Sequence, residues 1–150
     1  MKDIKIFFDE GRRFEARNIK PLIGIVGLYF IYNDEMAIQY PFHTSRLIYI
    51  GMSEKKTNSI GKRLQDHLEG NSGNEGIVSY GKVNKQSFTY INFEMLKRTW
   101  SLSIEDLESY FILEFVNKYG VYPICNNKSG YNILQKKIDS NLIIDWKYFE

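Results

Sequence analysis

Residues 26–32 read VGLYFIY and residues 46–51 read RLIYIG, and these two short stretches decide the fold of the chain. Both are rich in aromatic and β-branched residues, which favour strands, and both are bounded by polar turn formers or by glycine. The connection between them, residues 33–45, is too long for a tight hairpin and predicts an inserted loop with short structure of its own. We therefore expect two neighbouring strands of one sheet.

A first helix is predicted between Ser59, a residue typical of an N-terminal cap, and Gly70, a residue typical of a helix stop. Apolar residues recur on one side of it at four-residue spacing: Ile60, Leu64 and Leu68. Arg63 and His67 lie one turn apart beside this apolar stripe and can reach the rim of the sheet. For His67 alone, a hydrogen-bonded histidine at the edge of a core is the more common role.

A second helix is predicted from Ser103, again a cap, to a stop at Gly120. Its apolar residues fill one half of the helical wheel: Ile104, Leu107, Phe111, Ile112, Phe115, Val116 and Tyr119. Glu108 projects through the middle of that half. A buried carboxylate without a partner costs several kcal/mol, so Glu108 must be neutralised, paired with a cation or bound to a metal ion. On this pattern alone, a structural ion pair with an arginine explains Glu108 as well as a catalytic role does.

The remaining segments complete an α+β fold, in which helices flank a small, mostly antiparallel central sheet. The other predicted elements are a strand at 3–8, a helical stretch at 10–20 that Pro21 ends, a flexible surface loop at 69–76 and a strand at 87–93. For residues 140–149 the pattern does not decide between a strand and a helical turn. We expect a single domain over residues 1–150.

The composition restricts the class of protein further. With 43% hydrophobic and 15% aromatic residues, the 150-residue chain can form a core, which argues against a disordered or fibrous protein. Its only cysteine, Cys125, excludes an internal disulfide and a multi-cysteine zinc site. No apolar run approaches the ~20 residues needed to span a bilayer, and the opening residues lack the apolar stretch of a signal peptide. We expect a soluble, cytoplasmic protein with no membrane partner.

Basic residues are clustered, although the net charge is only +2. The clusters are Arg12, Arg13, Arg17 and Lys20; Lys55, Lys56, Lys62 and Arg63; Lys97 and Arg98; and Lys136 and Lys137. Local positive patches attract a phosphate backbone, so this distribution is compatible with nucleic-acid binding. Ordinary solvated faces would explain it equally well.

Several of these elements together resemble the GIY-YIG nuclease family. The resemblance consists of Gly27-Leu28-Tyr29 in the first strand, Tyr49-Ile50-Gly51 in the second, Arg63 on the following helix, Glu108 on the later helix, and Pro123 followed by Asn126. It covers a core of about residues 24–127, with extensions at both ends. The sequence departs from the minimal family members in having a longer connection between the two tyrosines and Leu28 in place of isoleucine. From its spacing to Pro123 we take Asn126, rather than Asn127, as the matching residue.

The resemblance implies a metal-dependent endonuclease that hydrolyses phosphodiester bonds in DNA. It implies a catalytic set of Tyr29, Tyr49, Arg63, His67, Glu108 and Asn126. In this set Glu108 would bind one Mg²⁺ (or Mn²⁺) ion, and Arg63 would hold a phosphate oxygen.

The other members of the set have supporting roles. Tyr49 would orient the water or the phosphate, and Asn126 would support the glutamate region. Either Tyr29, which the family favours, or His67 would activate the water. Lys55, Lys56 and Lys62 would bind DNA together with Arg63.

The spacing of Arg63 and His67 resembles the restriction and homing branches of the family more than the repair branch. Double-strand cleavage by one site per chain would need a homodimer or two successive nicks. Two alternatives stay open at this stage. One is a catalytically inactive nucleic-acid-binding module of the same fold, and the other is a structural domain in which Glu108 and Arg63 form a buried pair. Outside the motif, both tyrosines would be read as aromatic core.

Overall fold

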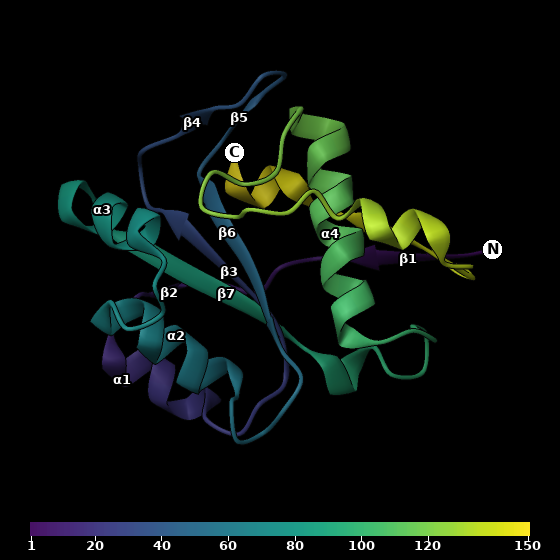
Figure 1. Cartoon of the computed structure of the whole chain (residues 1–150), viewed down its shortest axis with the longest axis horizontal. Coiled ribbons are helices and arrows are strands. Elements are labelled where there is room, and N and C mark those ends of the chain that lie inside the picture. The colour runs from purple at the N-terminus through teal and green to yellow at the C-terminus, as the bar shows by residue number, and fades with distance from the viewer.

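The computed structural model describes residues 1–150 and has an α+β fold around a four-stranded antiparallel sheet (Figure 1). The strand order is β2 (Arg12–Arg13), β7 (Gln86–Asn92), β3 (Gly27–Asn33) and β6 (Leu47–Ser53). Two smaller sheets lie outside it: β1 (Lys2–Ile6) pairs in parallel with β8 (Ser140–Ile144), and β4 (Ile38–Gln39) pairs with β5 (Thr44–Ser45). In the central sheet β6 is an edge strand, with β3 as its only paired strand.

Four α-helices and four 3₁₀ helices accompany the strands. The α-helices are α1 (Ala16–Ile19), α2 (Ile60–Glu69), α3 (Glu75–Val83) and α4 (Ile104–Tyr119). The 3₁₀ helices are η1 (Lys20–Leu22), η2 (Phe93–Met95), η3 (Tyr131–Gln135) and η4 (Trp146–Phe149). None of the helices combines the length and the apolar character that crossing a bilayer requires.

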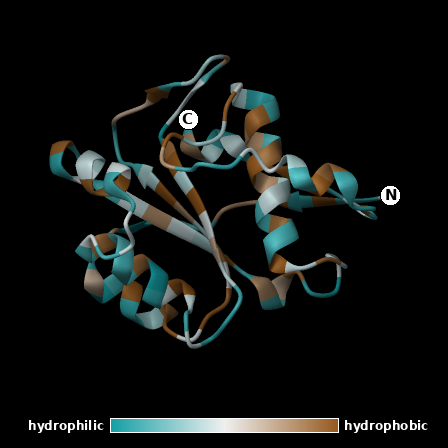
Figure 2. Cartoon of the chain, viewed as in Figure 1, coloured by the Kyte–Doolittle hydropathy of each residue, from teal (hydrophilic) through white to brown (hydrophobic).

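The central sheet separates two hydrophobic clusters because successive side chains of a strand point to opposite faces. On β3, Leu28 and Phe30 join the larger cluster, which includes most of the buried residues of α4. Tyr29 and Ile31 join the smaller cluster, which includes the apolar residues of α2. Figure 1 shows α4 on one side of β6 and α2 with α1 on the other, and in Figure 2 hydrophobic colouring gathers on the strands and along α4.

The predicted strands at 26–32 and 46–51 and both predicted helices are confirmed. Ser59 Oγ accepts a hydrogen bond from the backbone N–H of Lys62, and Ser103 Oγ accepts one from Asp106, so both caps form. Gly70 ends α2 in the left-handed region, with φ of 77°. These end signals are local, which is why the sequence predicted the two helices well.

Other expectations need correction. Residues 69–76 do not lead directly to the next strand, because α3 begins at Glu75 behind the cap Asn74, whose side chain accepts from Ile77 N–H. Leu68 is not part of the buried stripe of α2, since it is 37% exposed. The segment 10–20 holds the two-residue strand β2 and only one turn of α-helix, and Pro21 lies inside η1.

The C-terminal segment resolves the choice that the pattern left open: residues 140–149 form both β8 and the 3₁₀ turn η4. The chain that follows α4, from Gly130 to Leu142, also buries more of the helix than the predicted half of the wheel. Ser109, Tyr110 and Leu113 are buried as well, and the Tyr110 hydroxyl accepts a hydrogen bond from Leu142 N–H. The helix is therefore covered on two sides, by the sheet and by the C-terminal chain.

Candidate active site at the edge of the sheet

Tyr29 and Tyr49 lie on the same face of the sheet because of the register between β3 and β6. Tyr29 pairs with Gly51 and Ile31 pairs with Tyr49, so the two tyrosines are diagonal neighbours whose ring centroids are 6.0 Å apart. Gly51 has no side chain, and the Tyr29 ring occupies that space: a Cβ atom there would lie 2.3 Å from Tyr29 Cζ. The glycine of the motif is thus required for the position of the first tyrosine.

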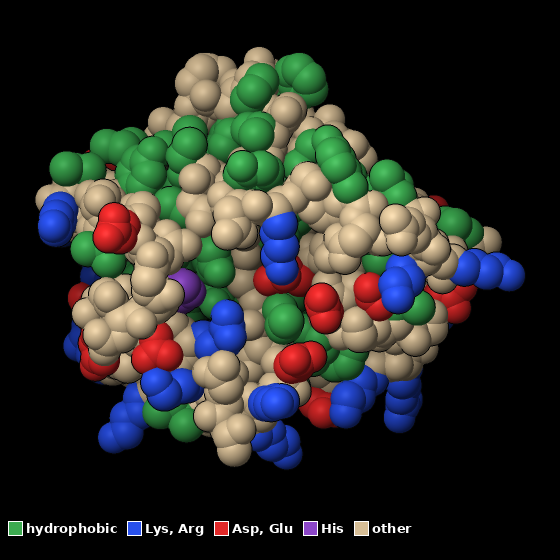
Figure 3. All heavy atoms as spheres, in the orientation of Figure 1, with side chains coloured by type: hydrophobic (Ala, Val, Ile, Leu, Met, Phe, Trp, Pro, Cys, Tyr) green, Lys and Arg blue, Asp and Glu red, His purple; other side chains and the backbone are tan.

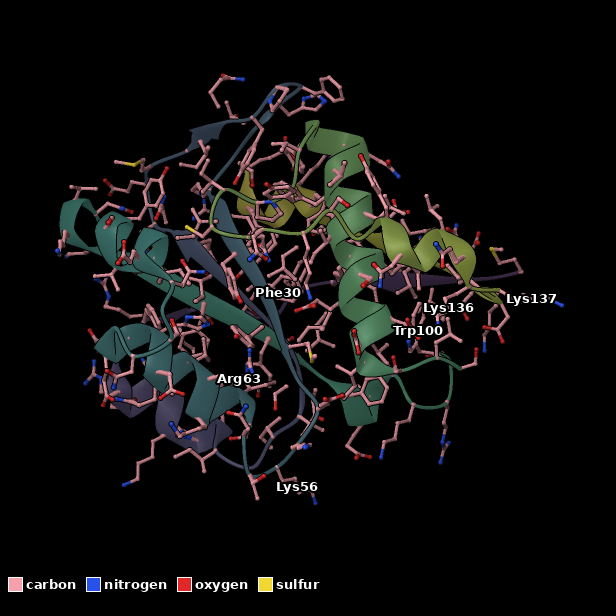
Figure 4. All side chains as sticks on the ribbon, viewed as in Figure 1. Phe30, Lys56, Arg63, Trp100, Lys136 and Lys137 are labelled. Carbon is pink, nitrogen blue, oxygen red and sulfur yellow. The ribbon has the colours of Figure 1, made fainter.

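Helix α2 brings Arg63 and His67 to the Tyr29 hydroxyl. Tyr29 Oη lies 3.0 Å from His67 Nε2, and Arg63 Nε donates to the same oxygen over 3.4 Å. The His67 ring also packs edge-on against Tyr49, with 5.0 Å between ring centroids. In Figure 4, Arg63 lies on the side of α2 that faces the sheet. One turn of helix therefore places a guanidinium and an imidazole on one phenol.

Glu108 points inward from α4, on the other side of β6, and is 4% exposed. The Lys128 ammonium forms an ion pair with Glu108 Oε1. Burial raises the pKa of Glu108, against the opposing effects of Lys128 and Arg63. The negative charge of Glu108 also helps to raise the pKa of Tyr49 and of Tyr29, so its field reaches the two phenols.

Burial also controls the protonation of the residues around Tyr29. It raises the pKa of Tyr29 far above that of a free phenol, and the adjacent Arg63 reduces this shift only in part. Burial, aided by the positive charge of Arg63, lowers the pKa of His67 to about 4. At neutral pH, Tyr29 is therefore a neutral phenol and His67 a neutral imidazole with one nitrogen free to accept a proton.

The second nitrogen of His67 has a partner as well. Nδ1 lies 2.7 Å from Ser72 Oγ in the turn between α2 and α3. If Nδ1 carries the proton and donates to Ser72, then Nε2 is the acceptor that faces the Tyr29 hydroxyl. The Ser72 hydroxyl can accept that proton, so the turn is compatible with the tautomer in which Tyr29 donates to His67.

The side chain of Asn126 lies against the free edge of β6. Its side-chain amide makes two hydrogen bonds to Ile50 on the free edge of β6: Oδ1 accepts from Ile50 N–H over 2.9 Å, and Nδ2 donates to Ile50 O over 2.8 Å. It has no hydrogen bond to Glu108. The amide fixes the strand that carries Tyr49, and that Asn126 supports the glutamate region stays a prediction.

A pocket of about 440 Å³ opens beside these residues. Its lining is almost entirely polar and comprises Tyr49, Asn58, Arg63, Asp66, His67, Asn71, Ser72, Gly73, Asn74 and Asn127. In Figure 3, basic and acidic side chains stand close together around the recessed middle of this face of the molecule. The pocket has the polarity that a phosphate group requires and lacks the apolar walls of a typical small-molecule site.

The basic residues predicted to contact DNA are distributed unevenly around this pocket. Lys55 and Lys56 are exposed in the turn after β6, where Figure 4 shows Lys56 at the margin of the molecule, and Lys55 lines a smaller cavity together with Arg63. Lys62 faces away and forms an ion pair with Asp66, with 2.7 Å between Nζ and Oδ1. Of the three lysines, Lys55 is the one that shares a cavity with Arg63.

Sequence reasoning missed two residues that contact the candidate site, Ser72 and Lys128. Ser72 lies in the segment read as a flexible loop, and the composition of that segment contains no sign of a contact with His67. Lys128 follows Asn126 by two positions, outside any helical or strand periodicity. The sign that could have pointed to Lys128 was indirect: the buried Glu108 needs a cation, and the matching arginine lies on another helix.

Glu108 is suited to bind a hard divalent cation, since its carboxylate is buried and already attracts one positive charge, that of Lys128. The structure has no group of three or more histidine, cysteine, aspartate or glutamate side chains arranged to hold a metal. A single carboxylate suits Mg²⁺, which usually keeps several waters and binds through one or two carboxylates and substrate phosphates. The residues present therefore fit such an ion.

Comparison of the chain with models of known protein families, with curated proteins and with solved structures gives no match.

Proposed function

We propose that the protein is a metal-dependent endonuclease of the GIY-YIG type, which hydrolyses phosphodiester bonds in DNA and uses Mg²⁺ or Mn²⁺. The observation that carries the proposal is the Tyr29 phenol held between Arg63 and His67, with Tyr49 packed beside it and the buried carboxylate of Glu108 acting on both tyrosines. These side chains come from β3, β6, α2 and α4. Tyr49, Arg63 and His67 line the polar pocket, and Tyr29 lies buried directly behind Arg63 and His67, an arrangement that a structural role for one residue would not explain.

Arg63 is suited to bind a non-bridging oxygen of the scissile phosphate. Burial acts to lower the pKa of Arg63, but Tyr29, Tyr49 and Glu108 together raise it, so the guanidinium stays charged while half-buried. Its Nε donates to Tyr29, which leaves the two terminal nitrogens of the planar group for a phosphate. Phosphate would therefore bind next to the Tyr29 hydroxyl.

Tyr29 and His67 provide a path for the proton that the attacking water must lose. Tyr29 alone is a poor base at neutral pH because burial keeps its phenol protonated. His67 is neutral, and its Nε2 can accept the phenol proton while the Tyr29 oxygen takes a proton from water. In this scheme His67 is the final acceptor, and Tyr29 is the group in contact with the water.

Glu108 would hold the divalent ion, which supplies positive charge to the phosphate and to the departing 3′ oxygen. Tyr49, on the strand fixed by Asn126, would orient the phosphate or the water from the other side of Tyr29. The four-residue spacing of Arg63 and His67 on α2 continues to favour a restriction or homing role over a repair role. Lys55, Lys56 and Lys62 would attract the DNA backbone, and Lys62 would do so only weakly because Asp66 neutralises it.

The test is nicking of supercoiled plasmid by the purified protein, with Mg²⁺ and with EDTA. Wild-type protein should convert supercoiled plasmid to the open circle only with the metal ion. Glu108→Ala should fold, bind DNA and fail to nick it. Glu105→Ala, which removes an exposed carboxylate from the first turn of the same helix, is the matched control and should nick at the wild-type rate. Equal nicking by wild type and Glu108→Ala would defeat the proposal.

One observation favours the alternative, a catalytically inactive DNA-binding module: the Glu108 carboxylate already has a lysine partner. Such a module would shift DNA in a gel with or without Mg²⁺ and would leave the plasmid supercoiled. A gel shift without nicking, at any concentration of Mg²⁺ or Mn²⁺, would show that the protein is such a module and would overturn the endonuclease proposal.

A further inference from the structure

Lys128 is the one cation in ion-pair contact with Glu108, and the proposed reaction gives it no role. The two partners differ in exposure: the Glu108 side chain is 5% exposed, whereas that of Lys128 is 49% exposed. The buried partner cannot leave the site, but the exposed one can move into solvent through rotation of its own side chain. The ion pair is thus fixed at one end and free at the other.

The backbone on the two sides of Lys128 is held by the fold. Before it, Cys125 N–H donates to Ile48 O over 2.9 Å and the Asn126 side chain binds Ile50, so this segment runs along the free edge of β6. After it, Gly130 adopts a φ of 78° and packs so closely on α4 that a Cβ atom would lie 2.3 Å from Ser109 O. These contacts place the lysine beside Glu108 as a feature of the architecture.

Arg63 does not provide the same neutralisation. It acts on Glu108 through its charge, but its Nε donates to Tyr29, and the pair of Arg63 and Glu108 expected as one alternative does not form as an ion pair. Without Lys128, the carboxylate would have no cation in contact. A carboxylate this deeply buried is stabilised by a cation in contact with it, and a lysine and a metal ion would compete for that place.

We propose that Lys128 is a displaceable internal counterion of Glu108: its ammonium holds the carboxylate in the metal-free protein, and a divalent cation must displace it in order to bind. This inference rests on the proposed function, since it takes Glu108 as the metal ligand. Lys128 is a positioning residue in this scheme. It holds the carboxylate in place in the metal-free protein and lowers the affinity of that site for the metal ion.

The test measures binding of Mn²⁺ alone, without DNA, by titration calorimetry and by the electron paramagnetic resonance of free Mn²⁺. Lys128→Met should bind Mn²⁺ with a Kd roughly three- to tenfold lower than wild type, the gain expected when a half-exposed ion pair no longer competes. Lys128→Arg keeps the cation and should retain the wild-type Kd. Lys97→Met removes a lysine of similar exposure from its ion pair with Glu94, and it should also leave the Kd unchanged.

The outcomes separate this proposal from the function on which it rests. Glu108→Gln should lose the Mn²⁺ site, and equal binding by Glu108→Gln and wild type would overturn both proposals. Loss of binding in Glu108→Gln, together with an unchanged or higher Kd in Lys128→Met, would overturn only the role of Lys128.

A second measurement needs no variant. The ¹³Cε signal of Lys128 in the wild-type protein should move toward that of a free lysine as Mg²⁺ is added. A signal that stays in place while Mg²⁺ binds would also overturn the role of Lys128.

Discussion

The two faces of the central sheet are built differently. The α4 face holds a hydrophobic cluster of 21 buried residues, in which aromatic rings such as Phe30 and Phe111 lie against one another, 5.6 Å apart. The α2 face holds a cluster of 10, and within or beside it lie a phenol and an imidazole whose charged forms burial disfavours. The comparison teaches that the α4 face supplies most of the apolar packing and one buried carboxylate, Glu108, while the α2 face holds the phenol, the imidazole and the guanidinium of the candidate site.

The largest effect is expected from breaking the α4 face. Phe111→Ala removes a fully buried ring and should lower the free energy of unfolding by about 3–5 kcal/mol, because a cavity is left in a closely packed cluster. Urea denaturation followed by circular dichroism measures this loss. Leu68→Ala, on the exposed side of α2, is the control and should cost less than about 1 kcal/mol. Equal losses in the two variants would show that the faces do not differ in this way.

The next largest effect is expected from a change on the α2 face, and it should appear in the rate of plasmid nicking. Tyr29→Phe removes one hydroxyl and should slow plasmid nicking by roughly a hundredfold to a thousandfold, as expected for the loss of a proton-transfer group. Its free energy of unfolding should change by only about 1 kcal/mol, since the ring stays in place.

Tyr110→Phe is the matched control for Tyr29→Phe. It removes a hydroxyl that bonds to Asn141 and Leu142 on the α4 face, and it should leave nicking unchanged. A nicking rate that falls equally in both variants would show that the loss reflects general damage to the fold.

The two faces also differ in how far the sequence could predict them. On the α4 face, the apolar half of the helical wheel between Ser103 and Gly120 predicted the helix. Glu108 was noticed because it interrupts that apolar pattern. Helix α3 was missed since Gly76 and Gly81 weaken its helical pattern and Asn74 resembles a turn former as much as a cap. Local sequence thus predicts an element when its cap, periodicity and stop all agree.

The gathering of the candidate site residues could be expected only through the family resemblance. The contact of Tyr29 with His67 depends on the way α2 packs on the sheet, and no local pattern encodes that. The contacts of Ser72 with His67 and of Lys128 with Glu108 join segments whose spacing carries no periodicity. The same holds for the parallel pairing of β1 with β8, which joins the two ends of the chain. Such long-range contacts arise from packing, and they decide the details of the site.

A smaller effect on stability should follow from removing the side-chain hydrogen bonds that hold the edge strand β6. Asn126→Ala removes both hydrogen bonds to Ile50, so the backbone N–H and C=O of Ile50 lose their side-chain partner. This loss should lower the free energy of unfolding by about 1–3 kcal/mol. Nicking should fall as well, because Ile50 lies between Tyr49 and Gly51. Asn127→Ala, at the neighbouring exposed position, should leave the stability within about 0.5 kcal/mol of wild type. The reverse ranking would mean that Asn127 is the residue that fixes the strand.

A final effect, spread over two pH units, sharpens the comparison between the two faces. The folded-state pKa of His67, about 4, lies below the unfolded value of 6.5, so the unfolded chain takes up a proton first as the pH falls. The stability that the neutral imidazole contributes is complete above pH 6.5 and is lost toward pH 4, with a slope of at most about 1.4 kcal/mol per pH unit. Urea denaturation at pH 4.5, 5.5 and 6.5 should show this slope in wild type and lose it in His67→Gln.

Glu108 has a raised pKa and contributes in the opposite direction, and it is present in both proteins, so the difference between them isolates His67. The α4 face offers a further comparison, since Phe111→Ala should change the stability by a similar amount at all three pH values. A slope that persists in His67→Gln would assign the acid sensitivity to other groups. It would also remove the argument that His67 is held neutral beside Tyr29.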